Sequence, residues 1–174
     1  MTEQQERFAI PGVGAIIEKK INGENCILVQ DRVKNRPHEG SHKEIGLLEI
    51  PAGKINEFED VYTCLRREVM EETGLELDRI EGEEDAEVVE VNGYRVLNYT
   101  PFSSSQNIEG YYPIIVQVFL CTARETPELN RESNETKNVR WEPAARIKEL
   151  MEYPEQFYPM HITTLKKYFR ARGI

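Results

Sequence analysis

Short apolar runs separated by turn residues dominate the first half of the chain and return before its last third. Runs of this length, bounded by Gly, Asn or Pro, are typical of buried β-strands. The pairs Asn22-Gly23 and Asn92-Gly93 favour tight hairpin turns, because both residue types tolerate positive φ angles. We expect strands over residues Phe8–Glu18, Cys26–Gln30, Leu47–Ile50, Ala86–Val91, Tyr94–Tyr99, Ile114–Cys121 and Asn138–Trp141.

A helical pattern replaces these short apolar runs over residues Glu57–Thr73. Val61, Leu65 and Val69 recur at four-residue spacing and form one apolar stripe, so this helix buries one face. The expected ends of the helix are an N-cap at Asn56, supported by Glu59 three residues later, and a left-handed C-terminal cap at Gly74.

Two more helices are expected at the carboxyl end, over Ala144–Met151 and about Pro154–Ala171. The second presents an apolar side that predicts a packed core face, formed by Tyr158, Ile162, Leu165 and Phe169. The remaining long stretches, Thr100–Pro113 and Thr122–Lys137, are expected to be loops. Because no internal repeat, low-complexity segment or linker interrupts the pattern, we expect residues 1–174 to form a single domain.

Composition narrows the class of protein. The chain is 39% hydrophobic and 30% charged, as soluble globular proteins are, and no apolar run reaches the roughly 20 residues of a membrane span. The N-terminus lacks the apolar stretch of a secretory signal, so a cytoplasmic location is expected. The chain has three cysteines, Cys26, Cys64 and Cys121. They are widely separated and lie among apolar neighbours, so we expect buried free thiols. A net charge of −9 makes a nucleic-acid partner unlikely, although a bound cation can locally invert the field.

Acidic residues carry the candidate chemistry, but only their spacing is informative, because Glu is by far the commoner acid. Glu68, Glu71 and Glu72 lie at i, i+3 and i+4, so a helix projects them from one side. Neighbouring carboxylates repel one another, and a hard divalent cation such as Mg²⁺ relieves the repulsion. Arg67, four residues before Glu71, can hydrogen-bond to that carboxylate. A solvated acidic helix face is the competing interpretation.

The surrounding segment decides between the two interpretations. Residues Gly53 to Leu75 read GKINEFEDVYTCLRREVMEETGL. They match the Nudix box, Gly-x5-Glu-x7-Arg-Glu-apolar-x-Glu-Glu-x-Gly-apolar, at every constrained position. Chance would give this match in roughly one such chain in 10⁵ at ordinary residue usage. The sequence therefore resembles the Nudix hydrolase family.

The resemblance implies an α+β fold, the Nudix αβα sandwich, with a mixed β-sheet between helices. It implies that Arg67 holds the catalytic helix in register, and that Glu59 is either a helix cap or a water-mediated metal contact. The implied cofactor is Mg²⁺, with Mn²⁺ as an alternative. Its implied ligands are Glu68, Glu71, Glu72 and the carbonyl of Gly53.

The implied reaction is attack of water on a phosphorus of a pyrophosphate bridge, which requires a base. In many relatives the base is a Glu on the loop before the last strand, and in others it is the first Glu of the triplet, here Glu68. On that loop Glu135 is the preferred candidate and Glu132 the next. Solvated surface charge is the competing interpretation for both.

Substrate contacts lie outside the box. A basic loop from Arg32 to Lys43 could reach phosphates, and Arg32 resembles a phosphate-contacting position in relatives; a solvated loop is the alternative. Tyr99 and Phe102 could stack on a base, although packing is the commoner role of an aromatic residue at a strand end. A homodimer is expected from the family.

The approach to the box, Leu48-Glu49-Ile50-Pro51-Ala52-Gly53-Lys54, resembles ADP-ribose and sugar-nucleotide pyrophosphatases. Relatives acting on ADP-ribose tend to have a Pro soon after the box, whereas here the first is Pro101. A nucleotide sugar such as ADP-ribose is the leading substrate class. The alternatives are hydrolysis of nucleoside triphosphates or dinucleoside polyphosphates, a non-catalytic nucleotide-sensing Nudix regulator, and an enzyme acting on RNA 5′ ends.

Overall fold

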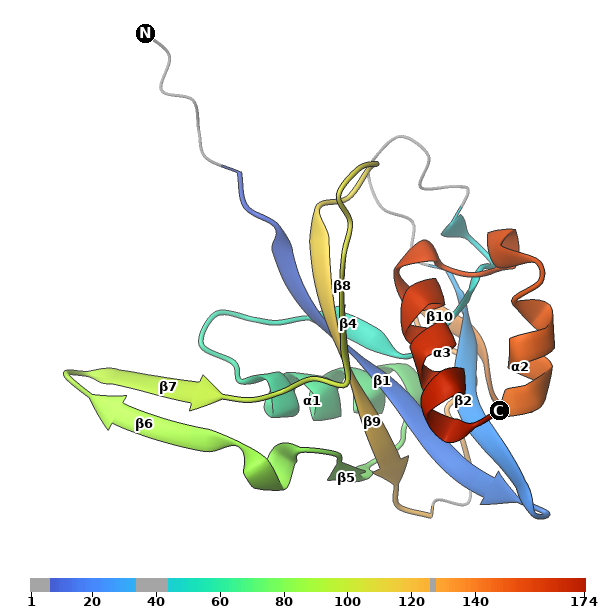
Figure 1. Cartoon of the computed structure of the whole chain (residues 1–174), viewed down its shortest axis with the longest axis horizontal. Coiled ribbons are helices and arrows are strands. Elements are labelled where there is room, and N and C mark those ends of the chain that lie inside the picture. Colours follow the sequence, from blue (N-terminus) through green and yellow to red (C-terminus); the bar gives the residue numbers. More distant parts are fainter. Residues whose placement is uncertain (1–6, 34–43, 126–127) are drawn as a thin grey trace, which may run out of the picture.

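A computed structural model describes residues 7–33, 44–125 and 128–174 of the chain. Most of the basic loop that sequence predicts, including Lys34, Arg36, His38, His42 and Lys43, lies outside the described residues. Within them, a mixed sheet is covered on both faces by helices (Figure 1). The helices are α1 (Val61–Thr73), α2 (Ala144–Leu150) and α3 (Pro159–Arg172), with short 3₁₀ turns η2 (Glu83–Asp85) and η3 (Pro154–Gln156).

The main sheet follows the order β10-β2-β1-β9-β5, and β3, β4 and β8 pair with β2, β1 and β9 respectively. β1 and β9 are parallel and the other pairs are antiparallel, which makes the sheet mixed. Its strands are β1 (Ile10–Ile21), β2 (Glu24–Arg32), β3 (Leu48–Glu49), β4 (Ala52–Lys54), β5 (Leu77–Ile80), β8 (Ser103–Gln106), β9 (Ile114–Ala123) and β10 (Thr136–Pro143).

Alternation along the central strands builds two cores, one on each face of the sheet. In β1, Val13, Ala15 and Ile17 pack with the residues of α1, whereas Ile16 packs with those of α2 and α3. Successive side chains of a strand point to opposite faces, so a continuous apolar run fills both layers. The expected αβα sandwich is confirmed.

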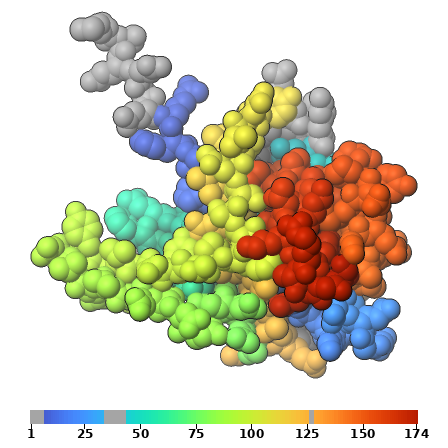
Figure 2. Space-filling model, viewed as in Figure 1, coloured from blue at the N-terminus to red at the C-terminus, as the bar shows by residue number. Residues whose placement is uncertain are grey.

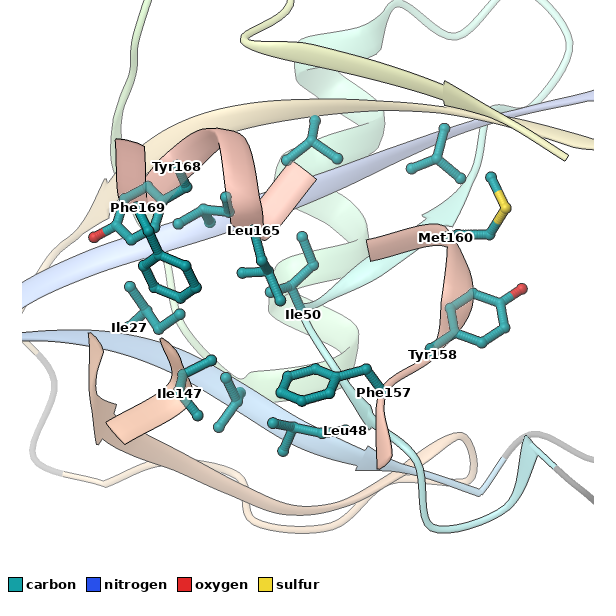
Figure 3. Packing of buried hydrophobic residues seen from close by; sticks show 14 of the residues in the cluster. Ile27, Leu48, Ile50, Ile147, Phe157, Tyr158, Met160, Leu165, Tyr168 and Phe169 are labelled. Carbon is teal, nitrogen blue, oxygen red and sulfur yellow. The ribbon is translucent and has the colours of Figure 1, made fainter. Parts of the chain in front are cut away.

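The second of these cores contains the apolar side of the last helix. Phe157, Tyr158, Leu165 and Phe169 are buried, and Figure 3 shows Phe157 and Leu165 beside Ile50. The predicted core face is therefore confirmed for Tyr158, Leu165 and Phe169, whereas Ile162 is only partly buried. The helix itself begins at Pro159 rather than near Pro154, because a 3₁₀ turn precedes it.

Both predicted hairpin turns are present. Asn22 and Gly23 have φ angles of 51° and 86°, and Asn92 and Gly93 have 50° and 80°. The second turn joins β6 (Glu87–Val91) to β7 (Tyr94–Asn98), which form a separate two-stranded sheet. This hairpin projects from the body of the molecule, and its strands are almost wholly exposed (Figures 1 and 2).

The N-terminus of α1 departs from the sequence prediction. The helix begins at Val61, and its N-cap is Asp60, whose Oδ1 accepts hydrogen bonds from the main-chain N–H groups of Tyr62 and Thr63 at 3.0 Å each. The prediction of Asn56 as the cap was wrong, because Phe58 adopts a φ of 58° and interrupts the helical turn. The C-terminal cap at Gly74, with a φ of 74°, is confirmed.

Three strands have no counterpart among the sequence predictions: β4, β5 and β8. β8 lies inside the stretch expected to be a long loop. Its sequence is Ser-Ser-Ser-Gln, so it carries no apolar signal, and its order comes from pairing with β9. The predicted free thiols are confirmed, since all three cysteines are buried and unpaired.

Candidate active site

Helix α1 carries the three acidic residues of the box. Glu68 and Glu72 are buried, at 8% and 2% exposure, whereas the Glu71 side chain is 59% exposed. All three line one small cavity of about 230 Å³. The opposite wall of that cavity is formed by Ser133, Asn134 and Glu135. The structure thus brings the preferred outside base candidate, Glu135, next to the triplet.

Gly53 makes room for Glu68. A Cβ atom placed on Gly53 would lie 1.7 Å from Cδ of Glu68, which is far inside van der Waals contact. Only glycine therefore leaves space for the carboxylate in this position. Gly53 lies on β4, and that strand is held against β1 by antiparallel pairing with Gly12–Gly14. A Cβ on Gly12 would in turn lie 3.0 Å from the Gly53 carbonyl oxygen.

Arg67 ties the helix to the loop that leads into it. Its guanidinium donates two parallel hydrogen bonds of 2.8 Å to the carboxylate of Glu59, and a third of 2.8 Å to Glu68 Oε1. It also donates to the carbonyl of Lys54 at 3.2 Å, while its contact with Glu71 is longer, at 3.4 Å. Arg67 therefore orients Glu68 more tightly than Glu71, the partner that sequence spacing predicts.

Glu59 is the anchor of this arrangement. Hydrogen bonds from Arg67 lower the pKa of its carboxyl group from 4.5 to about 2, and the main-chain N–H of Asn56 contributes in the same direction. Neither sequence interpretation of Glu59 describes this role: the helix cap is Asp60, and Glu59 binds Arg67 through both oxygens. It fixes the loop rather than the helix end.

Glu72 is held from the side of the sheet. Its Oε2 accepts a hydrogen bond of 2.8 Å from Gln30 Nε2 and one of 3.1 Å from the main-chain N–H of Ala52. The loop that carries Glu135 is attached to the same helix end, because Thr136 Oγ1 donates to the Glu72 carbonyl at 3.4 Å and Asn130 N–H donates to the Thr73 carbonyl at 2.9 Å. Local contacts therefore position Glu135 relative to α1.

A larger cavity of about 860 Å³ adjoins these groups. One part of its wall contains Gly53, Arg67, Glu68, Glu71 and Glu135. Another part is aromatic and apolar. It is formed by Tyr111, Tyr112, Tyr158, Ile10, Ile114 and Val116. The cavity thus combines an acidic, hydrogen-bonding side with a side suited to a flat organic group.

Arg32 lines the same cavity, but carboxylates surround it. Its side chain is 3% exposed and forms ion pairs of 2.9 Å with Glu49 and 3.1 Å with Glu44. The guanidinium carbon lies 4.1 Å above the ring of Tyr158. Burial lowers the pKa of Arg32, but attraction to Glu49 and its other anionic neighbours outweighs that effect and raises it. The guanidinium is therefore charged and already neutralised locally.

The remaining residues that the sequence suggested for the site, Glu132, Tyr99 and Phe102, line neither of the two cavities. Tyr99 packs edge-on against Tyr62 and donates a hydrogen bond to Gln117 at 2.5 Å. Phe102 packs against the core, beneath the Lys167 ammonium group. Both aromatic residues therefore have packing roles.

Among the described residues, no three acidic, histidine or cysteine side chains lie close enough together to hold a metal ion in their present positions. The donor set nevertheless fits a hard divalent cation. Glu68 and Glu72 are buried carboxylates that line the 230 Å³ cavity with Glu71 and Glu135, and oxygen is the ligand that Mg²⁺ prefers. Gly53 adds space for Glu68 where any side chain would remove it.

Sequence reasoning did not identify several residues of the site: Gln30, Glu49, Tyr111, Tyr112 and Tyr158 as a cavity residue. For two of them a signal existed. Gln30 ends the apolar run Cys-Ile-Leu-Val-Gln, and Glu49 interrupts the run Leu-Leu-Glu-Ile, so both are polar groups at positions expected to be buried. Buried polar groups require hydrogen-bond partners, so Gln30 and Glu49 could have been recognised as candidate members of a polar site. Tyr111 and Tyr112 follow an irregular loop and carry no comparable signal.

Comparison with known proteins agrees with the residues of the box. The NUDIX domain model matches residues 10–161. The chain therefore belongs to the Nudix hydrolase family, which acts on phosphoric anhydride bonds. Nudix hydrolase 7 of Arabidopsis thaliana is 38% identical over 72 residues, which cover 41% of this chain and 23% of that protein. The match thus spans about a quarter of that relative.

Solved structures of the same family share the fold. The NUDIX domain of Shewanella oneidensis NrtR, complexed with ADP ribose, superposes with a TM-score of 0.64 at 14% identity, covering 100% of this chain and 94% of that one. A C. elegans Ap4A hydrolase gives 0.57 at 17% identity, covering 94% and 98%. At such identities the similarity concerns the fold alone. No helix in the described parts of the chain is long and apolar enough to cross a membrane.

Proposed function

We propose that this protein is a Mg²⁺-dependent pyrophosphohydrolase that cleaves a nucleoside diphosphate linked to another group. The observation that carries the proposal is the cavity shared by Glu68, Glu71, Glu72 and Glu135, next to which Gly53 leaves space for the Glu68 carboxylate. Neighbouring carboxylates repel one another, and a divalent cation bound among them offsets that repulsion. Mn²⁺ is the alternative cation.

The residues that would hold the cation are Glu68, Glu71, Glu72 and the Gly53 carbonyl. When bound there, Mg²⁺ would neutralise negative charge on the phosphates and lower the pKa of a coordinated water. Arg67 keeps Glu68 in place by hydrogen bonds to Glu68 and, through Glu59, to the preceding loop. Glu68 is thereby held before substrate arrives, so this carboxylate needs less reorganisation during the reaction.

Glu135 is the proposed general base. It accepts a proton from the water whose oxygen attacks phosphorus, while the bond between that phosphorus and the bridging oxygen breaks. Its support is its place on the cavity wall opposite Glu68 and Glu71. Glu132, which lines neither the 230 Å³ nor the 860 Å³ cavity, is the less favoured candidate.

The leading substrate class is ADP-ribose or another nucleotide sugar. The 860 Å³ cavity is large enough for such a molecule, and its tyrosines suit stacking on a nucleobase or packing on a sugar. The NrtR domain, which shares the fold at 14% identity, is complexed with a member of this class, ADP ribose. Arg32, which lines the same cavity, is the proposed phosphate contact.

A panel of nucleotide sugars, nucleoside triphosphates and dinucleoside polyphosphates, each incubated with Mg²⁺ and resolved by mass spectrometry, tests this function. A nucleotide sugar should yield a nucleoside monophosphate and a sugar phosphate. Fastest turnover of a triphosphate or of a dinucleoside polyphosphate would reassign the substrate. Binding without turnover of any compound would instead identify a nucleotide-sensing regulator and contradict the proposal.

We also propose the homodimer expected from the family, with the β6–β7 hairpin as its contact. Val89 faces Val96 and Val91 faces Tyr94 across the hairpin, and all four are between 55% and 72% exposed. A two-stranded sheet is marginally stable alone in water, so a partner surface would stabilise it. Sedimentation velocity should show a dimer that Val91→Lys dissociates and Glu90→Gln, on the other face, does not. A wild-type monomer at all concentrations would contradict this assembly.

A further inference from the structure

Gln30 occupies a position where the strand pattern calls for an apolar residue. It lies near the end of β2, two residues after Leu28 of the α1-side core, and is 0% exposed. A buried amide is unfavourable unless its polar atoms are hydrogen-bonded. The partners of Gln30 therefore indicate what the protein gains from this residue.

Both hydrogens of the Gln30 amide are directed at carboxylates. Nε2 lies 2.8 Å from Glu72 Oε2 and 3.4 Å from Glu49 Oε1. These acceptors come from different elements, α1 and β3. Flipping the amide would place its oxygen against two carboxylate oxygens, which repel it. The two acids together therefore fix which way the amide points, even though Gln30 Oε1 has no partner among the described residues.

Glu49 is itself anchored. Its Oε2 accepts a hydrogen bond of 2.9 Å from Arg32 Nη1, and its side chain is 4% exposed. Rotation of Glu49 away from Gln30 would break this ion pair and leave Arg32, in a buried site, with Glu44 as its remaining acidic partner among the described residues. A continuous hydrogen-bonded chain thus runs from Arg32 through Glu49 and Gln30 to Glu72.

The chain ends on one oxygen of Glu72. That oxygen, Oε2, also accepts from the Ala52 main-chain N–H at 3.1 Å. Two donors from the sheet side, one on β2 and one on β4, thus determine the rotation of a carboxylate carried by α1. Neither donor carries a charge, so together they orient Glu72 without neutralising it.

We propose that Gln30 is a positioning residue for the metal site. It holds Glu72 in the orientation required for cation binding, and Glu49, anchored by Arg32, sets the direction of its amide. This inference rests on the proposed function, because it takes Glu72 to be a cation ligand. Residues that orient metal ligands through hydrogen bonds typically change metal affinity by about 10- to 100-fold when they are replaced.

The test is direct Mn²⁺ binding to the full chain without substrate, followed by electron paramagnetic resonance of the free ion. Gln30→Met keeps the length of the side chain and removes the donor. We expect its Mn²⁺ dissociation constant to rise at least tenfold. The midpoint of urea unfolding without metal should fall only modestly, because the loss of a donor to Glu72 and Glu49 is partly offset by the removal of a buried oxygen without a partner. The control is Gln117→Met, which removes a hydrogen bond to Tyr99 outside both cavities and should leave affinity unchanged.

A coupling measurement separates positioning from a general structural role. If Gln30 acts through Glu72, Gln30→Met should change the residual Mn²⁺ affinity of a Glu72→Ala protein by less than about twofold. An equal loss in both backgrounds would overturn the proposal. If Gln30→Met does not fold, Glu49→Gln replaces it, because that substitution removes the charge that directs the amide and should also weaken Mn²⁺ binding.

Two failures are distinguishable. Wild-type affinity in Gln30→Met, together with normal Mn²⁺ binding by the wild-type chain, would overturn the positioning role and leave the proposed function intact. Absence of Mn²⁺ binding by the wild-type chain would overturn the metal site itself, and the positioning role with it.

Discussion

The carboxylate of Glu68 occupies the space that a side chain on Gly53 would fill. A Cβ on Gly53 would stand 1.7 Å from Glu68 Cδ, although the two residues belong to different elements, β4 and α1. This relationship explains a fixed letter of the box in steric terms. The first glycine of the box is required by the position of an acid fifteen residues later.

Gly53→Ala should therefore inactivate the enzyme and leave it folded. The methyl group displaces the movable end of Glu68, and a misplacement of about 1 Å in a catalytic group can lower the rate by about 10²-fold. Steady-state kcat with the best substrate measures the loss, and urea unfolding measures stability. Gly14→Ala, whose Cβ would lie 3.3 Å from Val118, controls for adding a methyl group to this part of the sheet. Equal kcat in the two variants would refute the steric explanation.

Glu135→Gln should lower kcat by about 10²-fold or more, the usual effect of losing a general base. The matched control is Glu132→Gln, three residues earlier on the same loop, which should turn over at the wild-type rate. Initial rates at saturating Mg²⁺ and substrate give both values. An unchanged rate in Glu135→Gln would transfer the role of base to Glu68.

The pair of Arg67 and Glu59 predicts a contribution to acid stability. Because hydrogen bonds from Arg67 lower the pKa of Glu59 in the folded protein from 4.5 to about 2, folding favours the ionised form. This contribution is fully present above pH 4.5 and is lost as the pH falls toward 2. Urea unfolding at several pH values should show a steeper loss across this window for the wild type than for Glu59→Gln. If the free energy of unfolding fell equally with pH in the wild type and in Glu59→Gln, the pair would contribute nothing to acid stability.

Arg32→Met should destabilise the fold by about 3 kcal/mol or more, because it leaves Glu49 buried without its cation. Arg79→Met, which breaks an exposed ion pair with Glu84, should leave the free energy of unfolding close to that of the wild type. Chemical denaturation compares the two. If Arg32→Met raised KM but kept the unfolding free energy of the wild type, Arg32 would instead be purely a substrate contact.

The buried cysteines should resist alkylation. Burial raises the pKa of the Cys64 thiol to about 12, with a further contribution from Glu59, and burial also raises the pKa of Cys121. Only thiolates react quickly, so iodoacetamide at pH 8 should leave these two thiols unmodified in the folded protein and label them in urea. Mass spectrometry counts the labels. Rapid labelling under native conditions would show that this core opens readily.

Local signals in the sequence predicted the central strands, the helix of the box and both hairpin turns, whereas the sandwich was expected from the resemblance to the Nudix family. Runs of apolar residues define the central strands, and Asn-Gly pairs define the turns. β8 was not predictable in this way, since its polar residues are ordered by pairing with β9 and by contacts such as Ser103 with Thr164. Its order is a property of the tertiary structure.

In the candidate active site, too, local spacing predicted some contacts, whereas others depend on tertiary packing. Spacing on one helix was enough to group Glu68, Glu71 and Glu72. Spacing also suggested Glu71 as the partner of Arg67, but the tighter contacts are with Glu59 and Glu68, because the preceding loop folds back on the helix. Gln30 acquires its contact with Glu72 only when β2 and α1 pack together.

Hydrolysis by the wild type and by a Glu71→Gln/Glu72→Gln variant, compared with Mg²⁺ present and after chelation, tests the central claim most directly. We predict that the wild type cleaves a nucleotide sugar to a nucleoside monophosphate and a sugar phosphate, that chelation stops the reaction, and that the variant is slower by about 10²-fold or more. A variant that hydrolyses the same compound as fast as the wild type would contradict the assignment of these carboxylates to the metal site.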